Sequence, residues 1–514
     1  MSTEQKIKKL REKRAQVALG GGQDRIKKQH EAGKLTARER IEQLVDPESL
    51  QEAGMFAEHR ATLFGMAGKE FPADGVVTGA AYIDGRLVHL ASQDFTVGGG
   101  SAGEVHSDKI AEMMKQSTKL GTPFVFINDS GGARVQEGID SLSGYGRVFY
   151  QNVMLSGLVP QVSLICGPCA GGAAYSPALT DFIIQTRRAQ MFITGPSVIK
   201  QVTGEVVSMD ELGGPDAQMN FSGVVHFIAE DDADAVAICR KLLAFLPSNN
   251  LEDPPYVPGD YDLSDVADLE SIVPDDPKKP YDVRDVITRV LDHEDFLEVH
   301  ANFAKNIVVG FGRVAGHTVG VVANQPQEIG GALDIDASDK SSRFVRFCNA
   351  FNIPLVTFVD VPGFMPGVQQ EYGGIIRHGA KMLFAYSAAT VPKITIILRK
   401  AYGGAYLAMC SKDLGADRAV AWPTGEIAVM GAEGAVEVVF RKEITDAKDA
   451  AARRQELITE YRDTFASPYV AASRRLIDDI IEPNSTRRYI AKALAALQTK
   501  RELRPGKKHG LIPL

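Results

Sequence analysis

Two short glycine-rich stretches are the first residues of this sequence that could do chemistry. Gly171-Gly172-Ala173 follows the apolar run "VSLIC", and Gly403-Gly404-Ala405 follows "ITIIL". Glycine costs about 1 kcal/mol relative to alanine inside regular structure, so a repeated pair needs a local reason. Without a side chain, a peptide can approach a ligand closely and point its N–H groups at it. We therefore expect each stretch to be a turn whose backbone donors bind a negatively charged oxygen.

Each half of the chain carries a further glycine-rich turn upstream. The run "FVFIND" (residues 124–129) leads to Gly131, Gly132 and Ala133, and the run "LVTFVD" (residues 355–360) leads to Gly363, Phe364 and Gly367. Parallel strands of right-handed βαβ units end at one edge of the sheet, so the two turns of each half should converge there. Tight strand–helix packing is the alternative reason for these glycines. The recurrence of the same pair of turns in both halves favours the oxyanion-binding interpretation.

The strands and helices expected to position these turns occur in two similar copies along the chain. A shift of 231 residues, with a later slip of one, superimposes punctuating residues of the two halves: Gly85 on Gly316, Gly99-Gly100 on Gly330-Gly331, Ser107-Asp108-Lys109 on Ser338-Asp339-Lys340, Asp129 on Asp360, and residues 171–173 on 403–405. This pattern predicts an internal duplication. Apolar strands alternating with helices predict α/β layers. A segment rich in Pro, Asp and Asn, residues 245–286, separates the halves, and we predict domains at 1–258 and 266–506.

Composition narrows the class of protein. The 514 residues carry a net charge of −8, which argues against nucleic acid as the main partner. The five cysteines are scattered, and the lone CxxC of Cys166 and Cys169 favours buried structural thiols over zinc or disulfides, so we expect no metal. The N-terminus is charged throughout, unlike a secretory signal. The uncharged stretch 148–180 contains prolines and glycines that a lipid-facing helix would not readily carry, so we expect a cytoplasmic protein.

Four long motifs give the sequence a family resemblance: "DSGGARVQEGIDSLSGYG", "GPCAGGAAYSPALTDFI", "FVDVPGFMPGVQQEYGGIIRHGAKML" and "YGGAYLAMCSKDLGAD". They resemble the carboxyltransferase (β) subunits of biotin-dependent acyl-CoA carboxylases, such as the propionyl-CoA carboxylase β subunit. Methylmalonyl-CoA carboxyltransferases and methylmalonyl-CoA decarboxylase α subunits are equally similar. The resemblance implies two duplicated domains of the crotonase (ClpP-like) superfamily built from ββα units. It also implies a ring-like homo-hexamer, in which the N-terminal domain of one subunit faces the C-terminal domain of another.

The resemblance further implies a reaction and roles for residues. A carboxyl group moves from carboxybiotin to the α carbon of propionyl-CoA, or a similar short acyl-CoA, to give methylmalonyl-CoA. The N-terminal domain binds the acyl-CoA thioester and the C-terminal domain binds biotin, each with its own oxyanion hole. The residues expected to act are the catalytic turns Gly171, Gly172, Ala173 and Gly403, Gly404, Ala405; the substrate-binding Gly131, Gly132, Ala133, Arg134 and Leu407; and the biotin-binding Gly363, Phe364 and Gly367. Arg134, and the pair Arg377 and Lys381, could meet the phosphates of CoA or make ordinary ion pairs.

Missing motifs predict partners. The sequence has neither a biotinyl-lysine hairpin nor a G-x-x-x-x-G-K-[ST] phosphate loop. Activation of bicarbonate by ATP and the tethered biotin must then come from biotin carboxylase and biotin carboxyl carrier subunits. The alternative is a methylmalonyl-CoA decarboxylase α subunit or a transcarboxylase subunit, either of which would run the transfer from methylmalonyl-CoA to biotin. A decarboxylase α subunit would have membrane-embedded decarboxylase subunits as its partners.

Two residue-level observations bear on the alternatives. A stand-alone crotonase-type hydratase or isomerase needs an acidic residue near the oxyanion hole, and neither Gly-Gly-Ala turn has one within three residues downstream. Leu407 stands where propionyl-CoA carboxylases commonly carry aspartate, which puts strict propionyl-CoA specificity in doubt. No histidine is paired with a nucleophile in these turns, and we expect His378 at a surface or interface.

Overall fold

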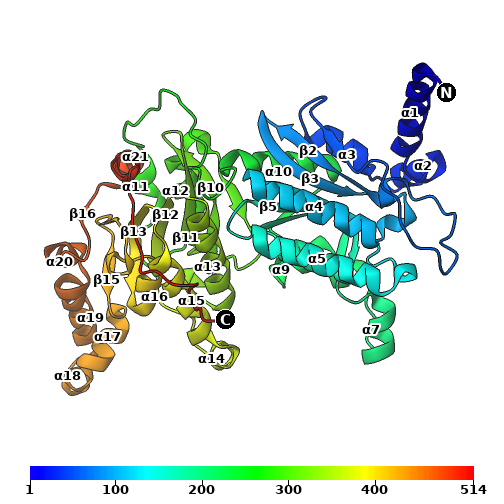
Figure 1. The fold of residues 1–514 in the computed structure, drawn as a ribbon. Coiled ribbons are helices and arrows are strands. Elements are labelled where there is room, and N and C mark those ends of the chain that lie inside the picture. Colours follow the sequence, from blue (N-terminus) through cyan, green and yellow to red (C-terminus); the bar gives the residue numbers. More distant parts are fainter. The chain divides into compact units, whose positions relative to one another are not determined.

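A computed structural model describes residues 1–514, which form two compact units, Met1–Glu252 and Asp253–Leu514 (Figure 1). Each unit is described by itself. The boundary between the units lies between Glu252 and Asp253. This boundary falls inside residues 245–286, the Pro-, Asp- and Asn-rich segment that separates the halves of the sequence. The domain limits 1–258 and 266–506 stay a prediction.

The first unit is built on one sheet in the strand order β1-β2-β3-β4-β5-β6-β8, with β7 paired to β5. The first three strands are antiparallel and the rest pair in parallel. Its strands are β1 (Gln51–Ala53), β2 (Val76–Ile83), β3 (Arg86–Gln93), β4 (Phe124–Ser130), β5 (Gln161–Ala170), β6 (Phe182–Thr186), β7 (Gln190–Phe192) and β8 (Phe227–Ala229). Its helices are α1 (Thr3–Ala18), α2 (Gln23–Glu31), α3 (Ala37–Leu44), α4 (Glu104–Leu120), α5 (Ile139–Leu155), α6 (Gly172–Ala178), α7 (Pro196–Thr203), α8 (Met209–Gly213), α9 (Pro215–Asn220) and α10 (Asp232–Phe245).

The second unit repeats this sheet in the order β16-β14-β13-β12-β11-β10-β9, with β15 paired to β13. Its strands are β9 (Leu297–Val299), β10 (Ile307–Val314), β11 (His317–Asn324), β12 (Leu355–Val361), β13 (Lys393–Tyr402), β14 (Arg418–Ala421), β15 (Glu426–Ala428) and β16 (Asp479–Ile480). Its helices are α11 (Leu269–Ile272), α12 (Val283–Val290), α13 (Ile335–Ala350), α14 (Val368–Gly373), α15 (Ile375–Ala388), α16 (Gly403–Ala408), α17 (Ala432–Val439), α18 (Arg441–Asp446), α19 (Ala450–Tyr461), α20 (Pro468–Ser473) and α21 (Thr486–Leu497). The predicted α/β class and the duplication into ββα-based domains are confirmed.

The repeated Ser-Asp-Lys triplet has a packing role in both units. Lys109 of α4 is buried, and its ammonium donates to the Ala73 carbonyl at 2.7 Å and to the Val76 carbonyl at the start of β2. Lys340 of α13 donates to the equivalent Ile307 carbonyl at the start of β10, at 2.7 Å. Backbone carbonyls thus supply the partners that a buried ammonium requires. The sequence repeat preserves the way the first long helix of each unit is attached to its sheet.

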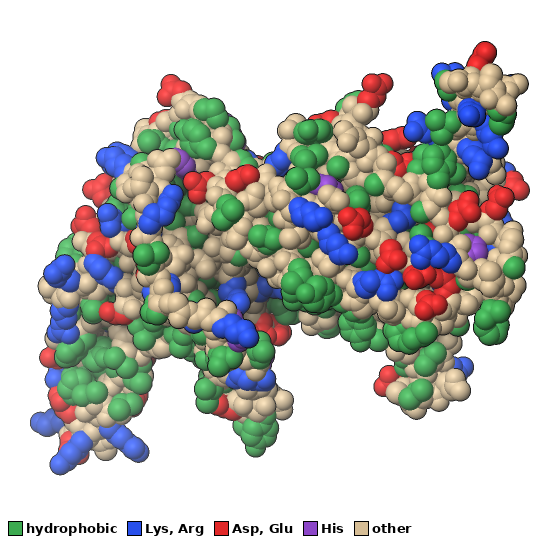
Figure 2. All heavy atoms as spheres, viewed as in Figure 1, with side chains coloured by type: hydrophobic (Ala, Val, Ile, Leu, Met, Phe, Trp, Pro, Cys, Tyr) green, Lys and Arg blue, Asp and Glu red, His purple; other side chains and the backbone are tan.

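Apolar strands form the core of each unit, as the sequence pattern predicts. In Figure 1, α4 and α5 lie beside each other across the first sheet, and α13 and α15 pack together in the second unit. The five cysteines are buried and free. None of the helices combines the length and the hydropathy that a membrane span requires. Figure 2 shows basic and acidic side chains interspersed with apolar ones over the face drawn. The exposed apolar residues of the second unit include Tyr372 of α14 and Val438 of α17.

Candidate functional site

In the first unit the two glycine-rich turns lie side by side. Ser130 at the end of β4 pairs with Cys169 near the end of β5, so the segments that follow both strands start next to each other. A Cβ atom at Gly132 would lie 2.8 Å from the Ala170 carbonyl oxygen. The predicted convergence of these two turns at one sheet edge is therefore present.

Hydrogen bonds use up most donors of the turn after β4. The Gly131 N–H donates to the Gly99 carbonyl at 2.9 Å, and the Gly132 N–H donates to Ser130 Oγ at 3.1 Å. The Arg134 N–H donates to the Ala102 carbonyl at 2.9 Å. Because Ala133 bridges Ala102 in this way, its own N–H has no acceptor within the chain. Ala133 is thus the donor that this turn can offer to a ligand.

The turn after β5 offers the complementary donors. The Gly171 N–H is occupied by the Phe192 carbonyl at 3.0 Å. Gly172 and Ala173 begin α6, and their N–H groups have no acceptor in the chain, as expected for the first positions of a helix. An oxygen placed between Ala133 and Gly172 could accept from both turns.

The second unit repeats the pair of converging turns. Val361 of β12 pairs with Ala401 of β13, which brings the following turns together. Leu333 donates to the Gly363 carbonyl at 3.1 Å and accepts from the Met365 N–H at 2.8 Å, so the Phe364 N–H between them is left without an acceptor. Phe364 is the equivalent of Ala133. The N–H groups of Gly404 and Ala405 at the start of α16 likewise lack acceptors.

The two glycines of each pair have different reasons to be glycine. Gly171 and Gly403 have φ values of 62° and 60°, a left-handed conformation that disfavours side chains. Gly172 has an ordinary φ but lies against the Tyr145 ring, where a Cβ atom would be 3.3 Å away. At Gly404 the φ is also ordinary, and the nearest atom to a Cβ would be in the Phe364 ring, at 4.0 Å. Neither conformation nor packing requires glycine at 404, which leaves room there for a ligand.

The other predicted site residues of the second unit are Gly363, Phe364 and Gly367, expected to bind biotin, and Leu407, expected to bind the acyl substrate. Gly363 and Gly367 have φ values of 153° and 135°, and a Cβ at either would meet nothing within 4 Å. The Phe364 ring packs against Gly379 of α15, where a Cβ would lie 2.9 Å away. Leu407 lies on α16, and 38% of its surface is exposed. All four residues are close in sequence to the donors just described.

Arg134 is placed differently from the expectation that it meets CoA phosphates. Its guanidinium is buried and lies 2.6 Å from Asp74 and 2.7 Å from Glu137, and its Cζ is 4.7 Å from the centroid of the Phe71 ring. A buried cation with two carboxylate partners has no free face for a phosphate. The structure therefore gives Arg134 the ion-pairing role that sequence analysis held as the alternative.

The other expected basic residues also have internal partners. Arg377 donates to the Leu514 carbonyl at 2.9 Å, and Lys381 pairs with Asp339 at 2.8 Å. His378 Nδ1 is 2.8 Å from the same Asp339 carboxylate. His378 thus belongs to a partly exposed ion-pair group at the junction of α13 and α15.

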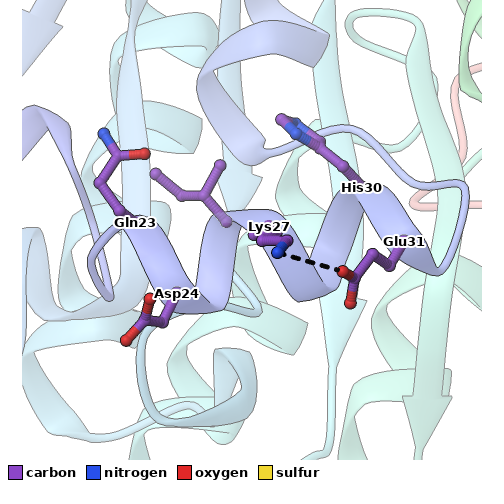
Figure 3. A pocket seen from close by; sticks show the side chains of 6 residues that line it. Gln23, Asp24, Lys27, His30 and Glu31 are labelled. Carbon is purple, nitrogen blue, oxygen red and sulfur yellow. Dashed lines mark ion pairs between the residues drawn. The ribbon is translucent and has the colours of Figure 1, made fainter.

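A hollow on the surface of α2 has none of these features (Figure 3). It is lined by residues of that single helix: Gln23, Asp24, Ile26, Lys27, His30 and Glu31. Figure 3 shows Lys27 directed towards Glu31, with the charged atoms 3.8 Å apart. Because both side chains are well exposed and no backbone turn opens into the hollow, we assign it no chemistry.

Sequence reasoning missed two tyrosines that contact the turns. Tyr145 of α5 packs on Gly172, and Tyr402 directly precedes Gly403. Tyr402 is the first residue of the motif "YGGAYLAMCSKDLGAD", but no spacing rule indicates what its side chain contacts.

Comparison with known proteins places these turns in a family. A profile described as the carboxyl transferase domain matches residues 28–512. The methylmalonyl-CoA carboxyltransferase 12S subunit of Propionibacterium freudenreichii subsp. shermanii is 62% identical over 510 residues, which cover 99% of this chain and 97% of that one. The methylmalonyl-CoA decarboxylase subunit alpha of Propionigenium modestum is 55% identical and covers 99% of both chains. The propionyl-CoA carboxylase carboxyltransferase subunit of Haloferax mediterranei is 55% identical over the whole of both chains.

A solved structure agrees over the same length. The transcarboxylase 12S crystal structure, described as a hexamer assembly with methylmalonyl-coenzyme A and methylmalonic acid bound, is similar with a TM-score of 0.98 and 61% identity. The similarity covers 100% of this chain and 99% of that chain. Since the profile and the relatives both span nearly all of its residues, this chain belongs to the carboxyl transferase family.

Proposed function

We propose that this chain is a carboxyltransferase subunit that moves a carboxyl group between methylmalonyl-CoA and biotin, with propionyl-CoA as the decarboxylated partner. The observation that carries the proposal is the pair of glycine turns. Each unit of this family member presents unbonded N–H groups from two converging turns, Ala133 with Gly172 and Phe364 with Gly404. Transfer between two carbonyl-containing substrates needs two such sites.

The first unit would hold the acyl-CoA thioester. Removal of the α-proton of an acyl-CoA places negative charge on the thioester oxygen, and preorganised donors stabilise that charge by several kcal/mol. Ala133 and Gly172 supply such donors, fixed by the sheet edge and by the Tyr145 ring. Formation of the new carbon–carbon bond at the α carbon then moves this negative charge from the thioester oxygen to the new carboxylate.

The second unit would hold biotin that is carried on a partner chain. When bound, carboxybiotin would supply the carboxyl group by cleavage of its N–C bond, and the ring nitrogen so released would take up the proton that leaves the α carbon. Gly404 fits a ureido oxygen because its N–H is unbonded and no atom other than the Phe364 ring lies near. The Phe364 N–H would be the second donor, so this unit orients the ring and excludes water from it.

The direction of overall reaction depends on partners. Relatives named as a decarboxylase and as a carboxylase have the same identity of 55% to this chain, and all would share the methylmalonyl-CoA and biotin half-reaction. A transcarboxylase is the second candidate, favoured by its 62% identity. Biotin carboxylase and carrier subunits, a homo-hexamer and a cytoplasmic location complete the proposal.

The half-reaction provides the test. Purified chain is incubated with methylmalonyl-CoA and free biotin, without ATP, and propionyl-CoA is measured by chromatography. We expect propionyl-CoA to form only when biotin is present. Crotonyl-CoA is offered in parallel, since hydration of that substrate without biotin-dependent transfer would instead support a hydratase.

A further inference from the structure

The Gly403–Ala405 turn of the second unit is preceded by a tyrosine with a side-chain hydrogen bond that has no counterpart at the Gly171–Ala173 turn of the first unit. In the ladder between β13 and β15, Tyr402 pairs with Ala428 and Lys400 pairs with Glu426. The Tyr402 hydroxyl donates to Glu426 Oε2. In the first unit the corresponding strand residues are Ala170 and Gln190, which cannot form such a bond. The duplication therefore preserves the turn but not this attachment.

Glu426 also forms an ion pair with an arginine from a distant part of the chain. Arg462, which follows α19, has Nε 3.7 Å from Glu426 Oε1 and donates from Nη2 to Glu433 at 2.8 Å. Burial of the phenol and its bond to Glu426 raise the pKa of Tyr402, so it remains a protonated donor at neutral pH. We call Tyr402, Glu426 and Arg462 the tyrosine clamp.

The ring of Tyr402 also supports the loop that covers Gly403. A Cβ atom at Gly431 would lie 3.2 Å from the Tyr402 ring, and a Cβ at Gly403 would lie 3.0 Å from the Val429 carbonyl oxygen. Residues 429–431 thus touch both Tyr402 and the first glycine of the turn. Displacement of the ring would move the peptide that leads into Gly404.

The two turns are supported from different sides. Gly172 rests on the Tyr145 ring of α5, at 3.3 Å from a Cβ position. Gly404 has no such neighbour, since only the Phe364 ring comes within 4.0 Å. The open space at Gly404 suits a ligand, but it leaves this peptide without a side chain packed against it. The tyrosine clamp holds the turn from the side of strand β13 instead.

We propose that Tyr402 is a positioning residue, whose bond to Glu426 fixes the direction of the Gly404 and Ala405 N–H groups. The proposal rests on the transfer function proposed above. It assigns the phenol no contact with either substrate. Its effect is to keep the two donors aligned when the ligand-side space is empty or filled.

The test uses Tyr402→Phe, Glu426→Gln and the double variant in the full chain. In the half-reaction with free biotin we expect Tyr402→Phe to lower kcat by about 10- to 100-fold, as for a misplaced donor. The dissociation constant for methylmalonyl-CoA, measured by calorimetry, should not change because the first turn is intact. The double variant should be no slower than the slower single variant, since both changes break the same bond. Arg453→Gln is the control, because Arg453 of α19 pairs with Glu443 of α18 and with Glu456 of α19, and neither pair involves Glu426.

A second readout does not depend on activity. Amide hydrogen exchange is followed by mass spectrometry in peptides that contain residues 403–405 and residues 171–173. We expect faster exchange only in the 403–405 peptide of Tyr402→Phe. Unchanged exchange and unchanged kcat in that variant would overturn the proposal. A wild-type chain without transfer activity would refute the proposed function, while the exchange comparison would still decide whether Tyr402 positions the turn.

Discussion

At Gly404 a methyl group would meet only the edge of the Phe364 ring, at 4.0 Å. We therefore expect Gly404→Ala to fold normally and Gly404→Val to assemble but lose transfer. A branched side chain would occupy the ligand space and re-aim the peptide, at an expected cost of roughly 3 kcal/mol in the transition state. The measurements are kcat for the half-reaction and the thermal unfolding midpoint of each variant.

Gly403→Ala is the matched control because it should lower the stability of the fold without placing a side chain in the ligand space. Its φ of 60° and the Val429 carbonyl at 3.0 Å predict a loss of about 1–2 kcal/mol in stability. If Gly404→Val instead turned over at the wild-type rate, the second glycine would have only a packing role.

Leu407 tests acyl-chain selection at the same scale. An apolar side chain should tolerate added methylenes, each worth at most about 0.8 kcal/mol of burial, so discrimination among short acyl chains should be modest. We expect activity on propionyl-CoA with measurable acetyl- or butyryl-CoA side activity, and a narrower range in Leu407→Asp. Because 38% of Leu407 is exposed, the change in stability should stay within about 0.5 kcal/mol.

The measurement is kcat/KM for acetyl-, propionyl- and butyryl-CoA, with cognate biotin partners supplied. A Leu407→Asn variant separates the effect of charge from that of polarity. Identical substrate ratios in wild type and Leu407→Asp would mean that the residue does not contact the acyl group.

At the scale of elements, the repeated aspartate near the end of β4 and of β12 forms ion pairs with different elements in the two units. Asp129 lies 2.9 Å from Arg40 of α3, which also pairs with Asp232 of α10 at 2.7 Å. Asp360 instead pairs with Arg399 of the adjacent strand β13, at 3.0 Å. In both units a buried carboxylate at the strand end fixes the start of a glycine turn.

Replacement of Arg40 should therefore be costly. Arg40→Met leaves two buried carboxylates without this partner, and we expect the free energy of unfolding to fall by about 3–5 kcal/mol. Arg187→Met is the control, because its pairs with Asp216 and Glu230 are exposed and should contribute at most about 1 kcal/mol. Urea unfolding followed by circular dichroism compares the two. Equal small losses would show that the Arg40 network does not stabilise the first unit.

At the scale of the whole molecule, the chain has two copies of one fold, and its sequence contains no G-x-x-x-x-G-K-[ST] phosphate-binding loop. We expect the purified chain neither to hydrolyse ATP nor to carboxylate propionyl-CoA with ATP and bicarbonate, because no phosphate-binding loop is present in the sequence. Release of phosphate and incorporation of labelled bicarbonate are the measurements. Addition of a biotin carboxylase and a biotinylated carrier is the positive control. ATP-dependent carboxylation by the chain alone would contradict the division of labour.

The sequence by itself determined the duplication, the α/β class, the positions of the four turns and the family. These features are local or periodic: glycines interrupt apolar strands at fixed spacing, and the spacing recurs 231 residues later. Leu407 and the Gly-Gly-Ala turns could be named for the same reason.

Only the tertiary structure decided which groups are free to act. Ala133 and Phe364 are left as donors because Ala102 and Leu333, some thirty residues earlier, bond to the peptides on either side of them. In the same way, Arg134 forms an ion pair with Asp74, and Tyr402 donates a hydrogen bond to Glu426. Hydrogen-bond partners and burial are set by chain segments that are distant in sequence, so residue type and spacing specify where a turn lies but not which of its groups remain unbonded.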